Sequence, residues 1–389
     1  MSHQKNHIDR ILLFIVLTLM VMSTVIVYSA SSSWAMQKFG ESSRLVSKHI
    51  IKILIGFGAM LFALNFNYNN YKKFTKIALI GAIILLMITL LLGGEVKGVT
   101  RWLNLGGLSI QPSELAKYFL IFHLSALIAT KGNKISDLNL GFYPLIMWIG
   151  IVVLLVMLQP NFSMGAVILI ISIIFLYLSG AKFTHLLSVA LASLPVVFIY
   201  LMSASYRRKR VMAFFGFGES SAISSTNYQL DQGLIGLGSG GIFGVGMGES
   251  RQRDLFLPEA YGDFVFSIIG EEYGFVGAII LMIGFLFLFL RGMRIAHHAK
   301  DDFGKYLAIG ISLLIVIYAT ANIFVTIGLA PTTGLPMPFI SYGGTAIILS
   351  SFAIGVLLNI SSQTDLFPRE IIKEEIPNSS EQKVSTVYS

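Results

Sequence analysis

Asp263 is the residue of this sequence best placed to do chemistry, because it is an acidic group at the start of a long apolar segment. The polar stretch Leu257-Pro-Glu-Ala-Tyr-Gly precedes it, and Glu271 and Glu272 lie two turns further along. Ionisable groups at membrane depth are energetically expensive, so they usually face a cavity, a partner or a substrate path. Residues 203–262, just before Asp263, are rich in glycine and basic residues. A carboxylate beside such a loop indicates chemistry on an anionic substrate carried by a lipid.

Asp263 also has a purely structural alternative, since aspartate is a favoured N-cap residue of helices. Glu271 and Glu272 lie about 12 to 13 Å beyond Asp263 if the segment is helical, with its rise of about 1.5 Å per residue. At that distance they cannot act jointly with Asp263, and we expect them to have a structural role or to line a polar channel.

A second polar segment leads into the apolar run 112–130. It contains Arg101 and Trp102, and then Pro112, Glu114 and Lys117. Proline suits the first turn of a helix, and an acidic group there suits the positive end of the helix dipole. Glu114 and Lys117 share one helix face and can form an ion pair. Either this pair only caps the helix or, because Lys117 lies one turn inside the apolar segment, it faces a pocket or the oxygens of a diphosphate.

Two basic or glycine-rich stretches lie between residues 203 and 262. Four adjacent cations at 207–210, among them Arg207 and Arg210, either attract anionic phosphates at a lipid surface or anchor the preceding helix by snorkelling. The stretch 228–253 contains Gln229 and Gln252 and formally matches G-x-G-x-x-G. No strand precedes those glycines, so we expect a loop that dips toward the membrane rather than a dinucleotide site.

The fourth segment, residues 331–345, contains Ser341 and is broken by prolines and glycines. Interrupted helix exposes backbone groups that can bind a polar ligand. A structural turn without a ligand explains this composition equally well.

Composition predicts the class of the protein. Hydrophobic residues make up 55% of the 389 residues and charged residues only 12%, with a mean hydropathy of +0.76. A soluble domain is about one quarter charged, so this is an integral membrane protein, and each crossing needs about 20 apolar residues. We predict an all-α fold of about ten transmembrane helices, a single membrane domain over residues 1–361, with no β-barrel alternation. The apolar runs are 9–30, 49–66, 75–93, 112–130, 142–159, 163–180, 183–202, 263–291, 304–328 and 339–361.

Lysine and arginine in the loops predict the orientation, because short cytoplasmic loops carry an excess of them. With the N-terminus inside, fifteen of these residues fall on the inner side, against six in the short outer loops. Both termini are therefore predicted to be cytoplasmic and the loop 203–262 extracytoplasmic. The run 9–30 is taken as a retained anchor, since its apolar core is longer than the usual signal-peptide core of about 7 to 15 residues. Residues 362–389 are polar and are predicted to form a disordered cytoplasmic tail.

Several function classes are excluded. The basic residues are scattered over short turns rather than massed on one face, which argues against nucleic-acid binding. The sequence has no cysteine, which excludes disulfides and thiolate metal sites. The histidines show no ligand spacing.

The four polar segments, in this order across ten apolar runs, resemble the SEDS family (shape, elongation, division and sporulation proteins). The resemblance extends from Val27-Tyr-Ser-Ala-Ser31 to Ile340-Ser-Tyr-Gly-Gly344. It rests on Arg101-Trp-Leu, Gln111-Pro-Ser-Glu-Leu-Ala-Lys117, Gly238-Ser-Gly-Gly, Leu257-Pro-Glu-Ala and Asp263-Phe. Gly246-Met-Gly-Glu-Ser-Arg-Gln252 is more similar to the division branch, that of FtsW, than to the elongation branch. Asn161 departs from a Pro-Asp-x-Gly pattern of the family and cannot supply a carboxylate.

The resemblance implies a peptidoglycan glycosyltransferase. It would polymerise lipid II on the outer face of the cytoplasmic membrane of a bacterium during cell division and release polyprenyl diphosphate, inverting the anomeric centre. Asp263 would be the catalytic carboxylate and the candidate ligand of a divalent cation, Mg²⁺ or Mn²⁺, with no organic cofactor. The substrate-binding residues so predicted are Arg101, Trp102, Glu114, Lys117, Arg207, Arg210, Gln229, Gln252, Glu259 and Ser341.

The implied partners are a class B penicillin-binding protein, which is a single-span transpeptidase, and other division proteins. The loop 203–262 has no serine-lysine motif of its own for cross-linking. We expect docking on the eighth and ninth apolar runs, where 285–290 is dense in Leu and Phe. A lipid II flippase, an elongation-type polymerase and a scaffold for division proteins are the alternatives. The polar residues gather at one end of the runs and no inverted repeat is visible, which disfavours the flippase.

Overall fold

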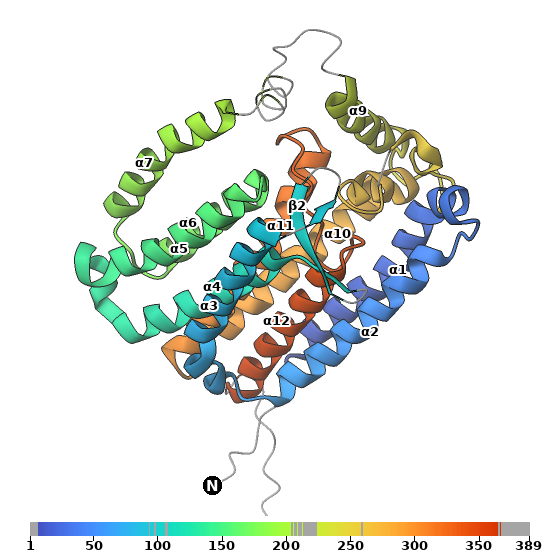
Figure 1. Ribbon diagram of the computed structural model, residues 1–389. Coiled ribbons are helices and arrows are strands. Elements are labelled where there is room, and N and C mark those ends of the chain that lie inside the picture. The colour runs from blue at the N-terminus through green and yellow to red at the C-terminus, as the bar shows by residue number, and fades with distance from the viewer. Residues whose placement is uncertain are drawn as a thin grey trace, which may run out of the picture.

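The computed structural model describes residues 7–92, 94–96, 99–105, 108–203, 205, 208, 212, 224–257, 260–364 and 366. Each of the ten predicted apolar runs coincides with one helix, so the mostly helical fold is confirmed (Figure 1). These helices are α1 (Arg10–Phe39), α2 (Arg44–Asn65), α3 (Tyr68–Leu92), α4 (Pro112–Lys131), α5 (Tyr143–Leu158), α6 (Phe162–Leu178), α7 (Phe183–Met202), α10 (Val265–His297), α11 (Asp302–Thr326) and α12 (Gly344–Gln363).

Not every one of these helices has the length and hydropathy expected of a membrane span. Among the described residues, eight segments are long and apolar enough to span a membrane. The helix α6 has only 17 residues, and α4, with Glu114 and Lys117 in its first two turns, is not among the eight. Ten crossings and the predicted orientation therefore stay predictions. The first run continues to Phe39 and the eighth to His297, well past the predicted ends.

The structure contains elements that the sequence did not predict. Three short strands, β1 (Gly94–Val96), β2 (Val99–Leu105) and β3 (Leu108–Ile110), form an antiparallel sheet in the order β1-β2-β3. The predicted loop 203–262 contains the helix α9 (Ser224–Ser239) and a π-helical turn, η3 (Gln252–Phe256). Two short helical turns, η1 (Gly132–Ser136) and η2 (Leu138–Phe142), join α4 to α5.

The helix α11 forms the centre of the bundle and α7 its edge. In α11, 72% of the most apolar window is buried, against 6% in α7, which stands apart from the other helices (Figure 1). The helix α11 packs against α4, α6 and α10, while α2 packs against α12. Residues that approach α11 from both sides are therefore brought together.

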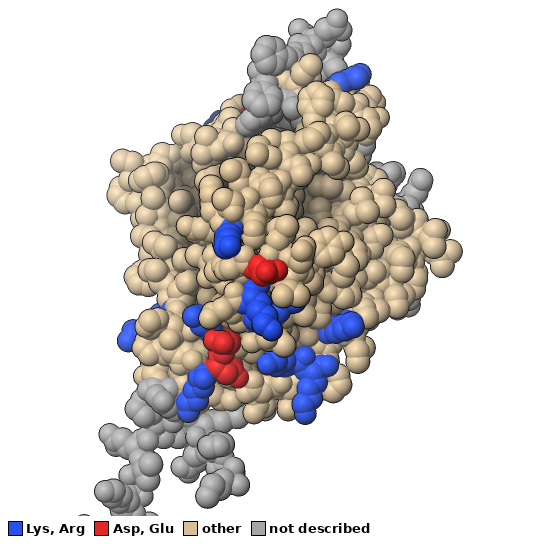
Figure 2. Space-filling view, turned by 90° about the vertical axis from the view of Figure 1, so that its left-hand side faces the viewer, with Lys and Arg blue, Asp and Glu red and all other residues tan. Residues whose placement is uncertain are grey.

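The start of α1 and the C-terminal parts of α10 and α12 meet at one end of the bundle, which we call the terminal end. Buried Asp9 caps α1 by accepting from the Leu12 amide, and its amide donates to the Ser361 hydroxyl at 3.1 Å. Arg291 of α10 forms an ion pair with the same carboxylate at 2.7 Å. On the face in Figure 2, most of the charged residues lie in the half toward this end, below a largely uncharged surface. The helix α12 extends two residues into the predicted tail, and residues beyond 366 lie outside the described residues.

At the opposite end, called the loop end, α10 is broken at Gly274, where φ is 67° and ψ is −166°. The glycine-rich segment that follows α9 supplies hydrogen-bond partners for the backbone groups at the break. The amides of Val245 and Gly246 donate to the carbonyls of Glu271 and Glu272 at 2.9 and 3.1 Å, and the carbonyls of residues 241 and 242 accept from the amides of residues 275 and 276. A broken membrane helix needs such partners for its backbone. The glycine-rich stretch predicted to be a loop is thus helical in its first half and packs on α10 in its second.

Candidate functional site

Asp263 lies half-buried in the turn before α10. The N-cap residue of α10 is Phe264, so the predicted alternative, an N-cap role for Asp263, is wrong. The side-chain nitrogen of Asn322 in α11 donates to the backbone carbonyl of Asp263 at 2.8 Å. The same nitrogen donates to the backbone carbonyl of Leu335, also at 2.8 Å. Asn322 is buried. The central helix therefore fixes the Asp263 turn and the segment 331–343 to each other.

The carboxylate of Asp263 lies directly against that segment. A Cβ placed on Gly334 would be 3.3 Å from Oδ2 of Asp263, and the φ of Gly334 is +71°. The Tyr342 amide donates to the carbonyl of Tyr261 at 2.9 Å, two residues before Asp263. The hydroxyl of Ser341 is buried and accepts from the Met337 amide at 2.8 Å. The observed contact of Ser341 is thus that of a turn-forming residue, while its predicted substrate contact stays a prediction.

Gly334→Ala tests the predicted catalytic role of Asp263, and we expect it to reduce activity by at least about tenfold, because a small displacement of a catalytic group has large effects. The new Cβ would contact the carboxylate of Asp263, and the alanine would have to adopt a left-handed backbone conformation. Gly328→Ala is the matched control, since its φ is +77° and its Cβ would meet only leucine side chains, at 3.7 and 3.9 Å. Thermal unfolding should show similar losses for both variants, and the activity per folded molecule should fall only for Gly334→Ala. Equal activity of the two variants would contradict the positioning of Asp263 by this segment.

The predicted ion pair of Glu114 and Lys117 is confirmed, with a distance of 2.8 Å and both side chains buried. Pro112 occupies the first turn of α4, as expected. The ammonium of Lys117 lies 3.7 Å from the centre of the Tyr318 ring of α11. Tyr318 and Asn322 are one turn apart on α11, about 6 Å at 1.5 Å per residue, and share a face. The same face of α11 therefore contacts Lys117 at one level and holds Asp263 at the next.

Lys117 also lines a small, mostly apolar cavity with Ser172 and Leu314. The hydroxyl of Ser172 is buried and has no hydrogen-bond partner in the part of the chain that the structure describes. Lys117 thus borders a small space inside the bundle.

The sheet places Arg101 and Trp102 at the loop end. Both are half-buried on β2, and Arg101 donates to the carbonyl of Pro160 at the corner between α5 and α6. Asn161, the residue that differs from the family's Pro-Asp-x-Gly pattern, comes directly after Pro160. It is buried, and its side-chain nitrogen lies 3.4 Å from the Met164 sulfur. Asn161 therefore has a packing role in α6.

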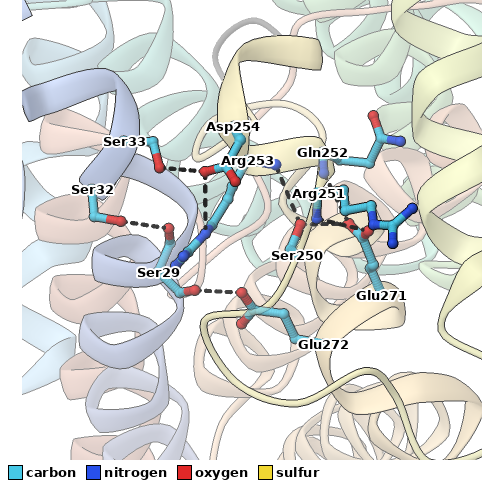
Figure 3. Close-up of polar contacts among 10 residues, drawn as sticks. All are labelled: Ser29, Ser32, Ser33, Ser250, Arg251, Gln252, Arg253, Asp254, Glu271 and Glu272. Atoms are coloured by element: carbon cyan, nitrogen blue, oxygen red, sulfur yellow. Dashed lines mark hydrogen bonds and ion pairs between the residues drawn. The ribbon is translucent and has the colours of Figure 1, made fainter. Parts of the chain in front are cut away.

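Glu271 and Glu272 tie three segments together (Figure 3). Glu271 accepts from the amides of Arg251 and Gln252 at 3.0 and 3.3 Å and from the Ser250 hydroxyl. Glu272 accepts from the hydroxyl of Ser29 in α1. These contacts agree with the predicted structural role of both glutamates.

Two further predicted site residues, Gln252 and Gln229, lie in the segment between α7 and α10. Gln252 is buried beside Glu271, and its side-chain oxygen has no partner among the described residues. Gln229 is half-buried on α9. Arg207, Arg210 and Glu259 lie outside the described residues.

Sequence reasoning missed Asn322 and a group of side chains around Tyr342. The ring of Tyr342 lies 3.9 Å from the Lys52 ammonium and is in contact with the rings of His49 and Tyr261, at centroid distances of 5.7 Å for each. The available signal was a polar residue inside an apolar run, which Asn322, His49 and Lys52 all share.

Among the described residues, no three acidic or histidine side chains converge in a way that could hold a metal ion. Asp263 therefore offers one carboxylate. Such a site fits Mg²⁺, which is often bound by one or two carboxylates together with substrate phosphates.

Comparisons with known proteins agree with this architecture. A model of the FtsW, RodA and SpoVE family, described as cell cycle protein, matches residues 9–366. A relative from Geobacter sulfurreducens, named probable peptidoglycan glycosyltransferase FtsW, is 35% identical over 357 residues, or 91% of this chain and 95% of the relative. Stage V sporulation protein E of Bacillus subtilis is 36% identical over 363 residues, or 93% of this chain and 99% of the relative.

Solved structures share the fold. A chain from a peptidoglycan synthase complex that coordinates polymerization and crosslinking matches with a TM-score of 0.74 and 23% identity, over 92% of this chain and 99% of that chain. The rod shape determining protein RodA of Thermus thermophilus matches with a TM-score of 0.68 and 22% identity, over 92% of this chain and 98% of that chain.

Proposed function

The chain belongs to the FtsW, RodA and SpoVE family, the SEDS family, and is a multi-pass bacterial membrane protein. On that premise we propose that it is a peptidoglycan glycosyltransferase that polymerises lipid II during cell division and releases polyprenyl diphosphate. The single observation that carries the proposal is the position of Asp263. Its backbone carbonyl is bound by Asn322 of α11, one helical turn from Tyr318, whose ring Lys117 contacts.

In this reaction a sugar hydroxyl of the acceptor attacks the anomeric carbon of the donor. The bond from that carbon to the diphosphate oxygen breaks, and the hydroxyl proton must be removed. A carboxylate within hydrogen-bond distance can accept this proton, and Asp263 supplies one. Direct displacement by a single acceptor inverts the anomeric centre, which gives a β-linked glycan from an α-linked donor.

The departing diphosphate gains negative charge, which fixed cations stabilise. Lys117 offers a buried ammonium, and Arg101 lies on the sheet at the same end of the bundle. A divalent cation held by Asp263 and the diphosphate would supply further charge stabilisation.

The proposed location is the cytoplasmic membrane, with the loop end on the extracytoplasmic face. The excess of lysine and arginine toward the terminal end supports this orientation (Figure 2).

The experiment that tests the function uses the purified full-length chain with lipid II in detergent or proteoliposomes, alone and with a transpeptidase partner. We expect glycan polymer, resolved by gel electrophoresis. If lipid II crosses the proteoliposome membrane and no polymer forms, with and without the partner, the protein is a flippase and not a polymerase.

The proposed partner is a class B penicillin-binding protein. Of the two helices expected to form the contact, α11 is largely buried, whereas α10 exposes Leu286, Phe287 and Leu290. Phe285 and Leu288 face the core, so only part of the dense 285–290 run is available.

Polar substitution of this exposed face is expected to weaken the complex, because association in lipid depends on side-chain packing. Leu286→Ser/Leu290→Ser should lower the co-purified transpeptidase in mild detergent several-fold. Leu191→Ser/Leu194→Ser is the control on α7, where both leucines are also exposed. Equal recovery of the partner with the two double variants would exclude this face of α10 as the contact.

A further inference from the structure

Lys52 is a cation inside a membrane helix. It lies eight residues into α2, about 12 Å along the helix axis, and is half-buried. No acidic side chain among the described residues pairs with its ammonium, which contacts the Tyr342 ring at 3.9 Å. A cation–π contact contributes about 0.5 to 2 kcal/mol. That is less than the cost of about 2.5 to 3.5 kcal/mol for a lysine at the centre of a membrane helix.

The ammonium of Lys52 points into the loop end beside the proposed active site. A Cβ on Gly344 would lie 3.4 Å from Nζ, so the ammonium lies against the start of α12. On one side, the amide of Tyr342 bonds to the carbonyl of Tyr261, two residues before Asp263. Lys52 is therefore separated from the Asp263 turn by one tyrosine.

On the other side, the start of α12 contacts the segment that leads to the buried ion pair. The hydroxyl of Thr345 lies 3.4 Å from both the carbonyl of Ser109 and the amide of Gln111, three residues before Glu114. The start of α12, against which Lys52 lies, is thus in contact with the segments that lead to both groups of residues that the proposed reaction uses.

The Tyr342 ring that Lys52 contacts is itself held by a neighbouring side chain. His49, one turn earlier on α2, is buried, is bonded to the Ser23 hydroxyl at 3.1 Å and is in ring contact with Tyr342. The aromatic ring and the packed helix therefore define where the ammonium can reach.

We propose that Lys52 binds a phosphate oxygen of a lipid-linked diphosphate and forms an anion subsite next to Asp263. The inference rests on the proposed function, which supplies the diphosphate. The shared chemistry is a phosphate on a lipid, which is found both in the substrate and in the headgroups of anionic phospholipids. The ion pair formed with the diphosphate would supply the counter-charge that the described protein residues do not.

The test measures binding of farnesyl diphosphate to the full-length protein in nanodiscs of phosphatidylcholine. Lys52→Met removes the charge and keeps an unbranched apolar side chain that suits the membrane, and it should raise the Kd by about tenfold or more, as for a lost charge-assisted hydrogen bond. Lys52→Arg should restore most of the affinity. Lys38→Met is the matched control, because this exposed lysine at the loop end of α1 also makes a cation–π contact, 4.5 Å from the Trp34 ring.

Two results would overturn the subsite. The first is an unchanged Kd for farnesyl diphosphate in Lys52→Met. The second is an effect of Lys52→Met that appears only when phosphatidylglycerol is added to the nanodiscs, which would assign Lys52 to bulk headgroups. Polymerisation by the wild-type protein is measured separately. Polymer formation with an unchanged Kd refutes the subsite alone, whereas absence of polymer refutes the proposed function.

Discussion

Asp263→Asn is expected to abolish polymerisation of lipid II. The substitution keeps the size of the side chain and the backbone bond from Asn322 but removes the group that can accept a proton. A general base contributes about 10²- to 10⁴-fold to a rate, so the loss should be at least 10²-fold, or about 2.7 kcal/mol of barrier. Polymer is measured from labelled lipid II with the purified variant at matched concentration.

The matched control is Asp231→Asn, which removes the same charge from an exposed position on α9. A surface substitution of this kind should change the rate by no more than about twofold. Both variants should accumulate in the membrane and unfold at the wild-type temperature. Near-normal turnover by Asp263→Asn would end both the general-base role and the metal-ligand role.

The helices were predictable from the sequence because the lipid environment leaves little choice. A run of about 20 apolar residues can satisfy its backbone in hydrocarbon only as a helix. Length and hydropathy alone therefore located α1 to α7 and α10 to α12. The strands and α9 could not be located in this way, because they lie in polar segments where no single period dominates. The break at Gly274 was also missed, since its carbonyl and amide partners come from residues 241–246, about thirty positions earlier.

The site was predictable only in part, for a related reason. A charged residue in an apolar run is conspicuous, which identified Asp263, Glu114 and Lys117. Their convergence depends on α11, whose contacts with α4 and with the Asp263 turn are set by packing between segments far apart in the sequence. Asn322 contributes no charge, and its role is visible only when both carbonyls that it binds are in place.

Glu114→Gln and Lys117→Met are each expected to destabilise the protein, because either change leaves a buried charge without its counter-charge. The pair is fully enclosed, with a separation of 2.8 Å. Breaking a buried pair costs about 3 to 5 kcal/mol of unfolding free energy, compared with under about 1 kcal/mol for a surface pair. Thermal unfolding in detergent, followed by tryptophan fluorescence, should show a lower midpoint for both single variants.

The double variant Glu114→Gln/Lys117→Met separates the structural role of the pair from its catalytic role. It has no uncompensated charge, so its unfolding midpoint should return close to that of the wild type, with a strong coupling between the two sites. Its polymerisation rate should nevertheless stay at least about 10²-fold low, because no ammonium would face the departing diphosphate. A double variant that is both stable and fully active would show that the pair only holds α4 in place, and that the charge for the leaving group comes from elsewhere at the loop end.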